Sequence, residues 1–124
     1  MPVVKAKTRV LIADDQAVIA DTLAIILNKS GFEATAVYSG ETAVETALMM
    51  NPDVLISDIV MTGMTGIDAA VRIRHGAPGC RVILFSGQAA SADMVFACRS
   101  EGQSFEFLEK PVHPTVLLDR LNRC

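Results

Sequence analysis

The sequence lacks the features that mark several large classes of protein. Its 11 Lys and Arg residues are outnumbered by 14 Asp and Glu, for a net charge of −3, whereas proteins that bind nucleic acid usually carry a basic stripe. Its five Phe and single Tyr are too scattered to form a platform for stacked bases. Every apolar run is only a few residues long, far short of the roughly 20 residues that span a bilayer. We therefore expect neither direct nucleic-acid binding nor membrane insertion.

Cysteine is also scarce. The chain has three cysteines, at positions 80, 98 and 124, with no CxxC spacing, so a disulfide framework is not expected. The first seven residues are too few and too polar for a signal peptide. Both observations favour a cytoplasmic protein with reduced thiols.

What remains is the composition of one globular domain. Of the 124 residues, 51% are hydrophobic and 20% charged, and a chain of this length usually forms one core. We expect a single domain over 1–124 with an ordered core at about 8–122. Strand and helix patterns alternate along it. The predicted strands lie at 9–13, 33–38, 53–58, 81–86 and 105–109. The five predicted helices lie at 17–29, between Ser39 and Pro52, at 65–74, at 91–100 and from Pro114 onward.

The strand segments are nearly continuous apolar runs, such as Val10-Leu11-Ile12-Ala13 and Val82-Ile83-Leu84-Phe85. Strands of this kind are buried on both faces, as in a parallel sheet covered by helices on both sides. Right-handed crossovers then give a doubly wound α/β fold. Because the first strand leads directly into the first helix, its loop should lie at the switch point of a flavodoxin-like sheet with strand order 2-1-3-4-5.

The helices should pack their apolar residues against this sheet. The residues expected to face inward are Val18, Ile19, Thr22, Leu23, Ile26 and Leu27 in the first helix, Ala43, Val44, Ala47 and Leu48 in the second, and Val116, Leu117 and Leu121 in the last.

Polar side chains follow the strands at the point where each one ends. Asp14 and Asp15 follow the first strand, Asp58 ends the third, Ser86 ends the fourth, and Lys110 follows the fifth. The carboxyl ends of parallel strands meet at one edge of the sheet, so these groups should converge. Clustered carboxylates favour a hard cation, and a lysine favours a phosphoryl group beside it. The alternatives are that the acid pair only caps a helix and that the lysine only forms a salt bridge. A proline after Lys110 allows a cis peptide there, and Gly87 should leave room for a group to approach Asp58.

These residues resemble those of the receiver domains of two-component response regulators, and the chain is similar to the single-domain, chemotaxis-type receivers. The resemblance extends from about Thr8 to Asn122. It rests on the acid pair, Asp58, Ser86, the Lys110-Pro111 pair, and the segment 58–66 with its methionines and Gly66. Phe107, three residues before the lysine, matches the aromatic switch position of the family.

The resemblance implies a regulatory domain that catalyses only its own phosphorylation and dephosphorylation. Asp58 would accept a phosphoryl group from a phosphohistidine of a sensor histidine kinase or a histidine phosphotransfer protein, assisted by Lys110. Mg²⁺ would be held by the carboxylates of Asp14, Asp15 and Asp58 and the backbone carbonyl of Val60.

The resemblance also implies how the signal leaves the domain. Ser86 and Phe107 would move on phosphorylation and alter the face formed by the helix at 91–100, the strand at 105–109 and the last helix. This face would control a downstream protein or output domain, with the receiver either a monomer or a phosphorylation-dependent dimer. We expect either a stand-alone receiver or part of a longer chain.

The sequence departs from the family at several positions. Thr62 stands where proline is usual, which predicts a more mobile loop, and His113 stands where an aspartate often caps the last helix, which predicts a poorer cap. Ser86 replaces the commoner threonine. Val60 and Gln88 stand at the two positions that flank the path of the attacking water, which predicts slow loss of the phosphoryl group.

Other functions remain open on the sequence alone. A haloacid-dehalogenase-like phosphatase also uses an aspartyl phosphate, but it needs a second acid two residues after the nucleophile, where this chain has Val60. A pseudo-receiver would bind a partner without being phosphorylated. A dinucleotide-binding fold is disfavoured because the first strand leads into acids and not into a glycine-rich loop.

Overall fold

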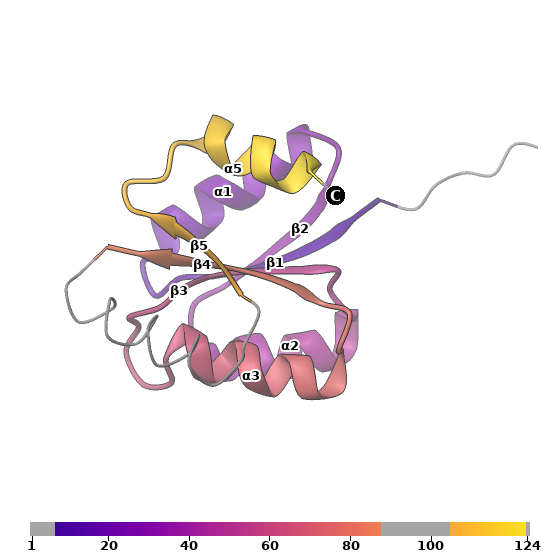
Figure 1. Cartoon of the computed structure of the whole chain (residues 1–124), viewed down its shortest axis with the longest axis vertical. Coiled ribbons are helices and arrows are strands. Elements are labelled where there is room, and N and C mark those ends of the chain that lie inside the picture. The colour runs from indigo at the N-terminus through magenta and orange to yellow at the C-terminus, as the bar shows by residue number, and fades with distance from the viewer. Residues whose placement is uncertain (1–6, 88–104, 124) are drawn as a thin grey trace, which may run out of the picture.

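The computed structural model describes residues 7–87 and 105–123 (Figure 1). Strands and helices alternate along the chain. Their bounds are β1 Arg9–Ala13, α1 Ala17–Lys29, β2 Glu33–Val37, α2 Gly40–Met50, β3 Val54–Asp58, α3 Gly66–Gly76, β4 Arg81–Ser86, β5 Glu106–Glu109 and α5 Pro114–Asn122. The predicted strands lie within one residue of these bounds, and α3 runs two residues further than expected. The predicted helix at 91–100 lies outside the described residues.

The five strands form one parallel sheet in the order β2-β1-β3-β4-β5, which confirms the predicted flavodoxin-like fold. Helices α1 and α5 cover one face of the sheet, and α2 and α3 cover the other (Figure 1). The described residues therefore contain four of the five predicted helices. No helix among them is long and apolar enough to cross a membrane.

Each face of the sheet has its own apolar core, because successive side chains of a strand point to opposite faces. In β1, Val10 and Ile12 belong to the core beneath α1 and α5, whereas Leu11 and Ala13 belong to the core above α2 and α3. All five residues of β3 are buried. This double burial is why the strands read as continuous apolar runs.

Local signals mark several helix ends as the sequence predicted. The hydroxyl of Ser39 accepts a hydrogen bond from the backbone N–H of Thr42 at 3.0 Å and caps α2. Gly31, just beyond α1, has a φ of +96°, a conformation that glycine adopts without steric cost. These caps fix where the helices start and stop, and so how long each connection to the next strand is.

The predicted inner faces of the helices are wrong in part. Val18, Leu48 and Val116 were expected to pack inward, but their exposed fractions are 78%, 75% and 49%. Ile19 and Thr22 were also expected to pack inward and are exposed. In α1 the buried residues are Ala20, Leu23, Ala24 and Leu27. The physical reason is the close approach of the helix to the sheet, because the small side chain of alanine lets the helix axis lie near it. A helix with apolar residues on more than half its circumference must also leave some of them exposed.

Candidate functional site

The three predicted acids come together at the carboxyl edge of the sheet. Asp14 and Asp15 follow β1, and Asp58 is the last residue of the neighbouring β3, where Ala13 lies opposite Ser57. One carboxylate oxygen from each acid lies within 4.8 Å of the others. Asp14 and Asp58 are buried, and Asp15 is exposed.

Lys110 reaches this cluster from beyond β5. Its ammonium nitrogen lies 2.6 Å from Oδ2 of Asp58, across the intervening strand β4. Its backbone N–H donates to the carbonyl of Ser86 at 2.9 Å, which continues the pairing of β4 with β5. The peptide bond between Lys110 and Pro111 is cis, an option that the sequence left open. The lysine is therefore fixed at its backbone by the sheet and at its tip by Asp58.

Gly87 makes room for the side chain of Lys110. A Cβ atom at position 87 would lie 3.0 Å from both Cβ and Cδ of Lys110. The methylene stem of Lys110 takes the space beside Gly87, and the approach of a group to Asp58 stays a prediction. Glycine at this position allows that stem to pass close to the backbone on its way to the carboxylate.

Asp14 is the most deeply buried acid of the cluster, with an exposed fraction of 2%. Its Oδ1 accepts a hydrogen bond from the backbone N–H of Gln16 at 2.9 Å. Burial raises the pKa of Asp14, the Gln16 bond acts to lower it, and the nearby charge of Asp58 raises it further. The N-cap of α1 is Gln16, so neither acid of the pair occupies the capping position that the alternative interpretation required.

Asp15 has a partner that the sequence analysis missed. Its Oδ2 accepts two hydrogen bonds from Thr62, one from the backbone N–H at 3.0 Å and one from the hydroxyl at 3.2 Å. The two residues are 47 positions apart in the sequence. The only available signal was the departure at Thr62 itself, since a proline there has no N–H to donate.

The loop that carries Thr62 is held at both ends. The backbone N–H of Gly66 donates to the carbonyl of Ile59 at 2.9 Å. A Cβ at Gly66 would lie 2.1 Å from the carbonyl oxygen of Asp58, so only glycine allows this approach. The hydroxyl of the buried Ser57 donates to the same Asp58 carbonyl at 2.9 Å. These contacts fix the backbone on which the central carboxylate stands.

Ser86 and Phe107 lie on one face of the sheet. Leu84 pairs with Phe107 across β4 and β5, and both pack in the core on the α2 and α3 side. Ser86 is two residues beyond Leu84, and residues two apart in a strand share a face. Asp58 lies opposite Phe85, so Ser86 is one residue past the position level with Asp58.

His113 does cap the last helix. It is the N-cap of α5, and its Nδ1 accepts a hydrogen bond from the backbone N–H of Thr115 at 3.2 Å. A ring nitrogen thus takes the place of the carboxylate oxygen that the resemblance led us to expect.

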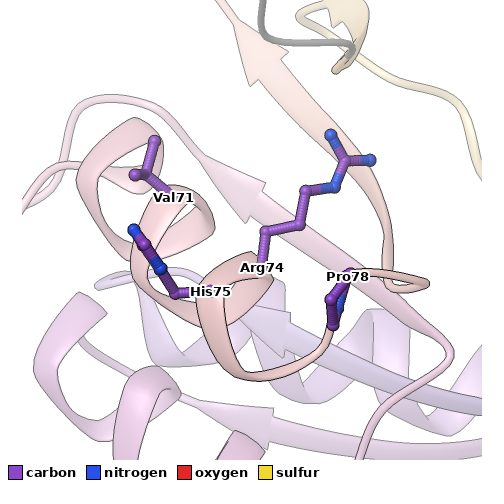
Figure 2. A pocket seen from close by; sticks show the side chains of 4 residues that line it. All are labelled: Val71, Arg74, His75 and Pro78. Carbon is purple, nitrogen blue, oxygen red and sulfur yellow. The ribbon is translucent and has the colours of Figure 1, made fainter.

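Of the pockets among the described residues, one lies beside the acid cluster and another lies far from it. One, of about 410 Å³, lies beside the cluster and is lined by Ile19, Leu23, Phe85, Lys110, Pro111 and Val112. The other lies at the end of α3, at the opposite edge of the sheet, where Val71, Arg74, His75 and Pro78 line it (Figure 2). Its Arg74 donates to the carbonyl of Cys80 at 3.2 Å and lies over the ring of Phe105. The second pocket contains no carboxylate and is separate from the acid cluster.

The acid cluster has the donor set of a site for a hard divalent cation. Three carboxylates offer oxygen ligands within a small radius, and such ligands are those that Mg²⁺ takes in proteins, together with waters. Among the described residues, Lys110 is the ammonium group in contact with them, and it cannot neutralise three negative charges. The site therefore fits a cation, which would relieve the repulsion that contributes to the raised pKa of Asp14.

Fold and site together define a doubly wound α/β domain with an acidic cluster and a lysine at the carboxyl edge of its sheet. The sequence profile described as the response regulator receiver domain matches residues 10–122. The chain belongs to this family, a class of regulatory signalling domains of two-component systems and not of conventional enzymes.

Individual relatives agree with this assignment. The chain is 34% identical to the chemotaxis protein CheY of Thermotoga maritima over 93% of this chain and 95% of that protein. It is 27% identical to the DNA-binding response regulator MtrA of Mycobacterium tuberculosis over 93% of this chain but only 49% of that protein. The chain thus spans about half the length of MtrA. The solved structure of the chemotaxis protein CheY4 of Vibrio cholerae superposes with a TM-score of 0.83 at 27% identity, covering 95% of this chain and 98% of that one.

Proposed function

We propose that this receiver domain accepts a phosphoryl group on Asp58 from a phosphohistidine of a sensor histidine kinase or a histidine phosphotransfer protein. The observation that supports this most is the ion pair between Lys110 and Oδ2 of Asp58, set inside a cluster of three acids. A lysine held against one carboxylate of an acidic cluster marks that carboxylate as the place where further negative charge is accommodated.

In the proposed transfer, a carboxylate oxygen of Asp58 forms a bond to phosphorus while the bond from phosphorus to the imidazole nitrogen breaks. The electron pair of that bond leaves with the imidazole. Charge spreads over the phosphoryl oxygens during this exchange. Lys110 is already within hydrogen-bonding distance of Asp58 and would stabilise those oxygens as they arrive.

The metal ligands that we propose are the carboxylates of Asp14, Asp15 and Asp58 and the backbone carbonyl of Val60. When bound, Mg²⁺ supplies positive charge and orients oxygen ligands at the reacting phosphoryl group. In this chain, all three carboxylates accept hydrogen bonds. Packing also restricts Asp14 and Asp58, which are buried, whereas Asp15 is exposed.

We further propose that Ser86 and Phe107 form the switch. The hydroxyl of Ser86 would bond a phosphoryl oxygen, and Phe107, half-buried on the same face of the sheet, would move into the space left behind. The surface around β5 and α5, together with the helix expected at 91–100, would then change shape and control a downstream protein or output domain.

The setting that we propose is a cytoplasmic phosphorelay with no direct binding of nucleic acid by this domain and no membrane contact. The relatives illustrate two ways of using a receiver: one is named as a chemotaxis protein and another as a DNA-binding regulator. Residues 1–124 would act as one receiver, either alone or joined to an output domain, and as a monomer or a phosphorylation-dependent dimer.

The acceptor is tested by mass spectrometry of the intact protein after incubation with acetyl phosphate and Mg²⁺. The wild type should gain one phosphoryl group that is labile in base, and Asp58→Asn should gain none. Asp68→Asn, which changes an exposed acid in the first turn of α3, is the matched control and should be phosphorylated normally. Phosphorylation of Asp58→Asn would refute the assignment, and an unreactive wild type would favour the pseudo-receiver.

The metal site is tested by calorimetric titration of Mg²⁺ into the unphosphorylated protein. We expect weak binding to the wild type, because three carboxylates supply few ligands and Mg²⁺ retains several waters. Asp15→Asn should lose both this binding and phosphorylation. An unchanged titration curve in Asp15→Asn would remove this carboxylate from the set of ligands.

A further inference from the structure

We propose that Thr62 is a positioning residue for the carboxylate of Asp15, and that it sets the Mg²⁺ affinity of this receiver. The inference rests on the proposed metal site and concerns the contact between Thr62 and Asp15. Two donors of Thr62, the backbone N–H and the hydroxyl, lie 3.0 and 3.2 Å from Oδ2 of Asp15.

The geometry of these bonds favours support of a metal ligand over competition with the metal. Both bonds end on the same oxygen, Oδ2. A carboxylate has two oxygens and about four sites for accepting bonds, so Oδ1 stays available to a cation. Two donors on one oxygen also restrict rotation of the carboxylate about its terminal bond.

Asp15 has particular need of such support. Asp14 and Asp58 are buried, so packing restricts their side chains, whereas Asp15 is exposed. An exposed aspartate loses conformational freedom when it binds a metal, and that loss weakens binding. Hydrogen bonds from Thr62 order the side chain in advance, in the way that outer partners of metal ligands generally do.

Thr62 is itself held in place by its loop. The hydrogen bond from Gly66 to Ile59 closes the loop at 2.9 Å. Gly63, the next residue after Thr62, has a φ of +82°, and a Cβ there would lie 2.9 Å from a carboxylate oxygen of Glu41 on α2. The donors therefore come from a packed loop, and Thr62 connects that loop to the end of β1. The mobility that the sequence suggested for this loop is opposed by the same two bonds.

The test is Mg²⁺ titration of four variants by calorimetry, without a phosphodonor. Thr62→Val removes the hydroxyl donor and should weaken Mg²⁺ binding about threefold. Thr62→Pro removes both donors and should weaken it about tenfold, at the lower end of the range for outer-shell changes. Thr62→Ser keeps both donors and should bind as the wild type does. Thr22→Val, an exposed threonine on α1, is the matched control and should also be unchanged.

A second measurement separates positioning from general disturbance of the loop. Because Asp15→Ala should itself lose Mg²⁺ binding, this comparison is read as thermal unfolding without Mg²⁺. Thr62→Val should lower the melting temperature of the wild type but not that of Asp15→Ala, because the bond it removes no longer exists there. An additive loss in this double variant would overturn the proposal. So would unchanged or tighter Mg²⁺ binding in Thr62→Val and Thr62→Pro, the tighter result indicating competition.

The outcomes also distinguish this inference from the proposed function. If Asp15→Asn loses Mg²⁺ while all the Thr62 variants bind it normally, the metal site stands and the role of Thr62 is refuted. If the wild type binds no Mg²⁺ at any accessible concentration, the metal site itself is refuted, and the positioning role with it.

Discussion

Replacing Gly87 with alanine should slow phosphorylation of Asp58 without unfolding the protein. The new Cβ would lie 3.0 Å from Cβ and Cδ of Lys110 and 3.3 Å from its Cγ. Non-bonded carbon atoms prefer separations of about 3.5–4.0 Å. The stem of Lys110 must therefore retreat by a few tenths of an ångström, and because its Cβ and Cγ are close to the backbone, it cannot simply swing aside.

The size of the effect follows from the position of the ammonium group. Its nitrogen lies 2.6 Å from Oδ2 of Asp58, so a retreat of that size lengthens a short contact and weakens the hydrogen bond without breaking it. A displacement of about 1 Å at a reacting centre can cost about 100-fold in rate. A shift of a few tenths of an ångström should therefore lower the rate of phosphorylation about threefold to tenfold. Gly87 does not have a positive φ, so alanine should introduce no backbone strain of its own.

The assay is a time course of phosphorylation by acetyl phosphate and Mg²⁺, followed by intact mass, with thermal unfolding as a check on the fold. Gly76→Ala is the matched control, because a Cβ there meets nothing within 4 Å. Lys110→Met should be slow by itself, and adding Gly87→Ala to it should change little. A Gly87→Ala protein that reacts within twofold of the wild type, or a double variant in which the losses add, would refute this account of the lysine.

Three other predictions concern stability and the lifetime of the phosphorylated state. The Arg81 guanidinium forms a two-pronged ion pair with Glu106 and lowers the pKa of that carboxyl. This stabilisation is present above the unfolded value of about 4.5 and is lost as the pH falls through the lower folded pKa. Glu106→Gln should therefore cost about 1–2 kcal/mol in urea unfolding at pH 7 and little in acid; an equal cost at both pH values would contradict this. His113→Ala should lower the unfolding free energy by about 1 kcal/mol, because the N–H of Thr115 loses its cap, whereas His113→Asp should leave the unfolding free energy unchanged. Equal melting temperatures in the two variants would show that the cap contributes nothing. Val60 is half-exposed, two residues after Asp58, and its side chain cannot orient a water. Val60→Asn should therefore shorten the phosphoryl lifetime about tenfold, measured as decay of the phosphorylated mass after the donor is removed. The companion position, Gln88, lies outside the described residues.

Much of the architecture was legible in the sequence. Buried parallel strands need apolar side chains on both faces, so runs such as Val54-Leu55-Ile56 are visible without a structure. Parallel strands also all end at one edge. This is why residues as distant as Asp14, Asp58 and Lys110 could be expected to meet, and why the resemblance to receivers could be found from them.

The orientation of the helices was harder to predict. Apolar periodicity indicated that α1 and α5 pack against the sheet, but it placed Val18 and Val116 inward when both are exposed. The rotation of a helix about its axis depends on how closely it approaches the sheet and its neighbours. Small residues such as Ala20 and Ala24 set that approach, and a hydrophobicity pattern gives alanine little weight.

The contacts that distinguish this receiver depend on tertiary structure alone. The sequence by itself determined which side chains lie at the carboxyl edge, because strand period and strand direction are local properties. It could not show that Thr62 donates to Asp15, or that the stem of Lys110 fills the space over Gly87. Each contact joins segments brought together only when the loops pack, and a hydrogen bond forms or fails over a few tenths of an ångström. Distances on that scale are decided by the summed packing of the whole domain, and no local pattern of residues encodes them.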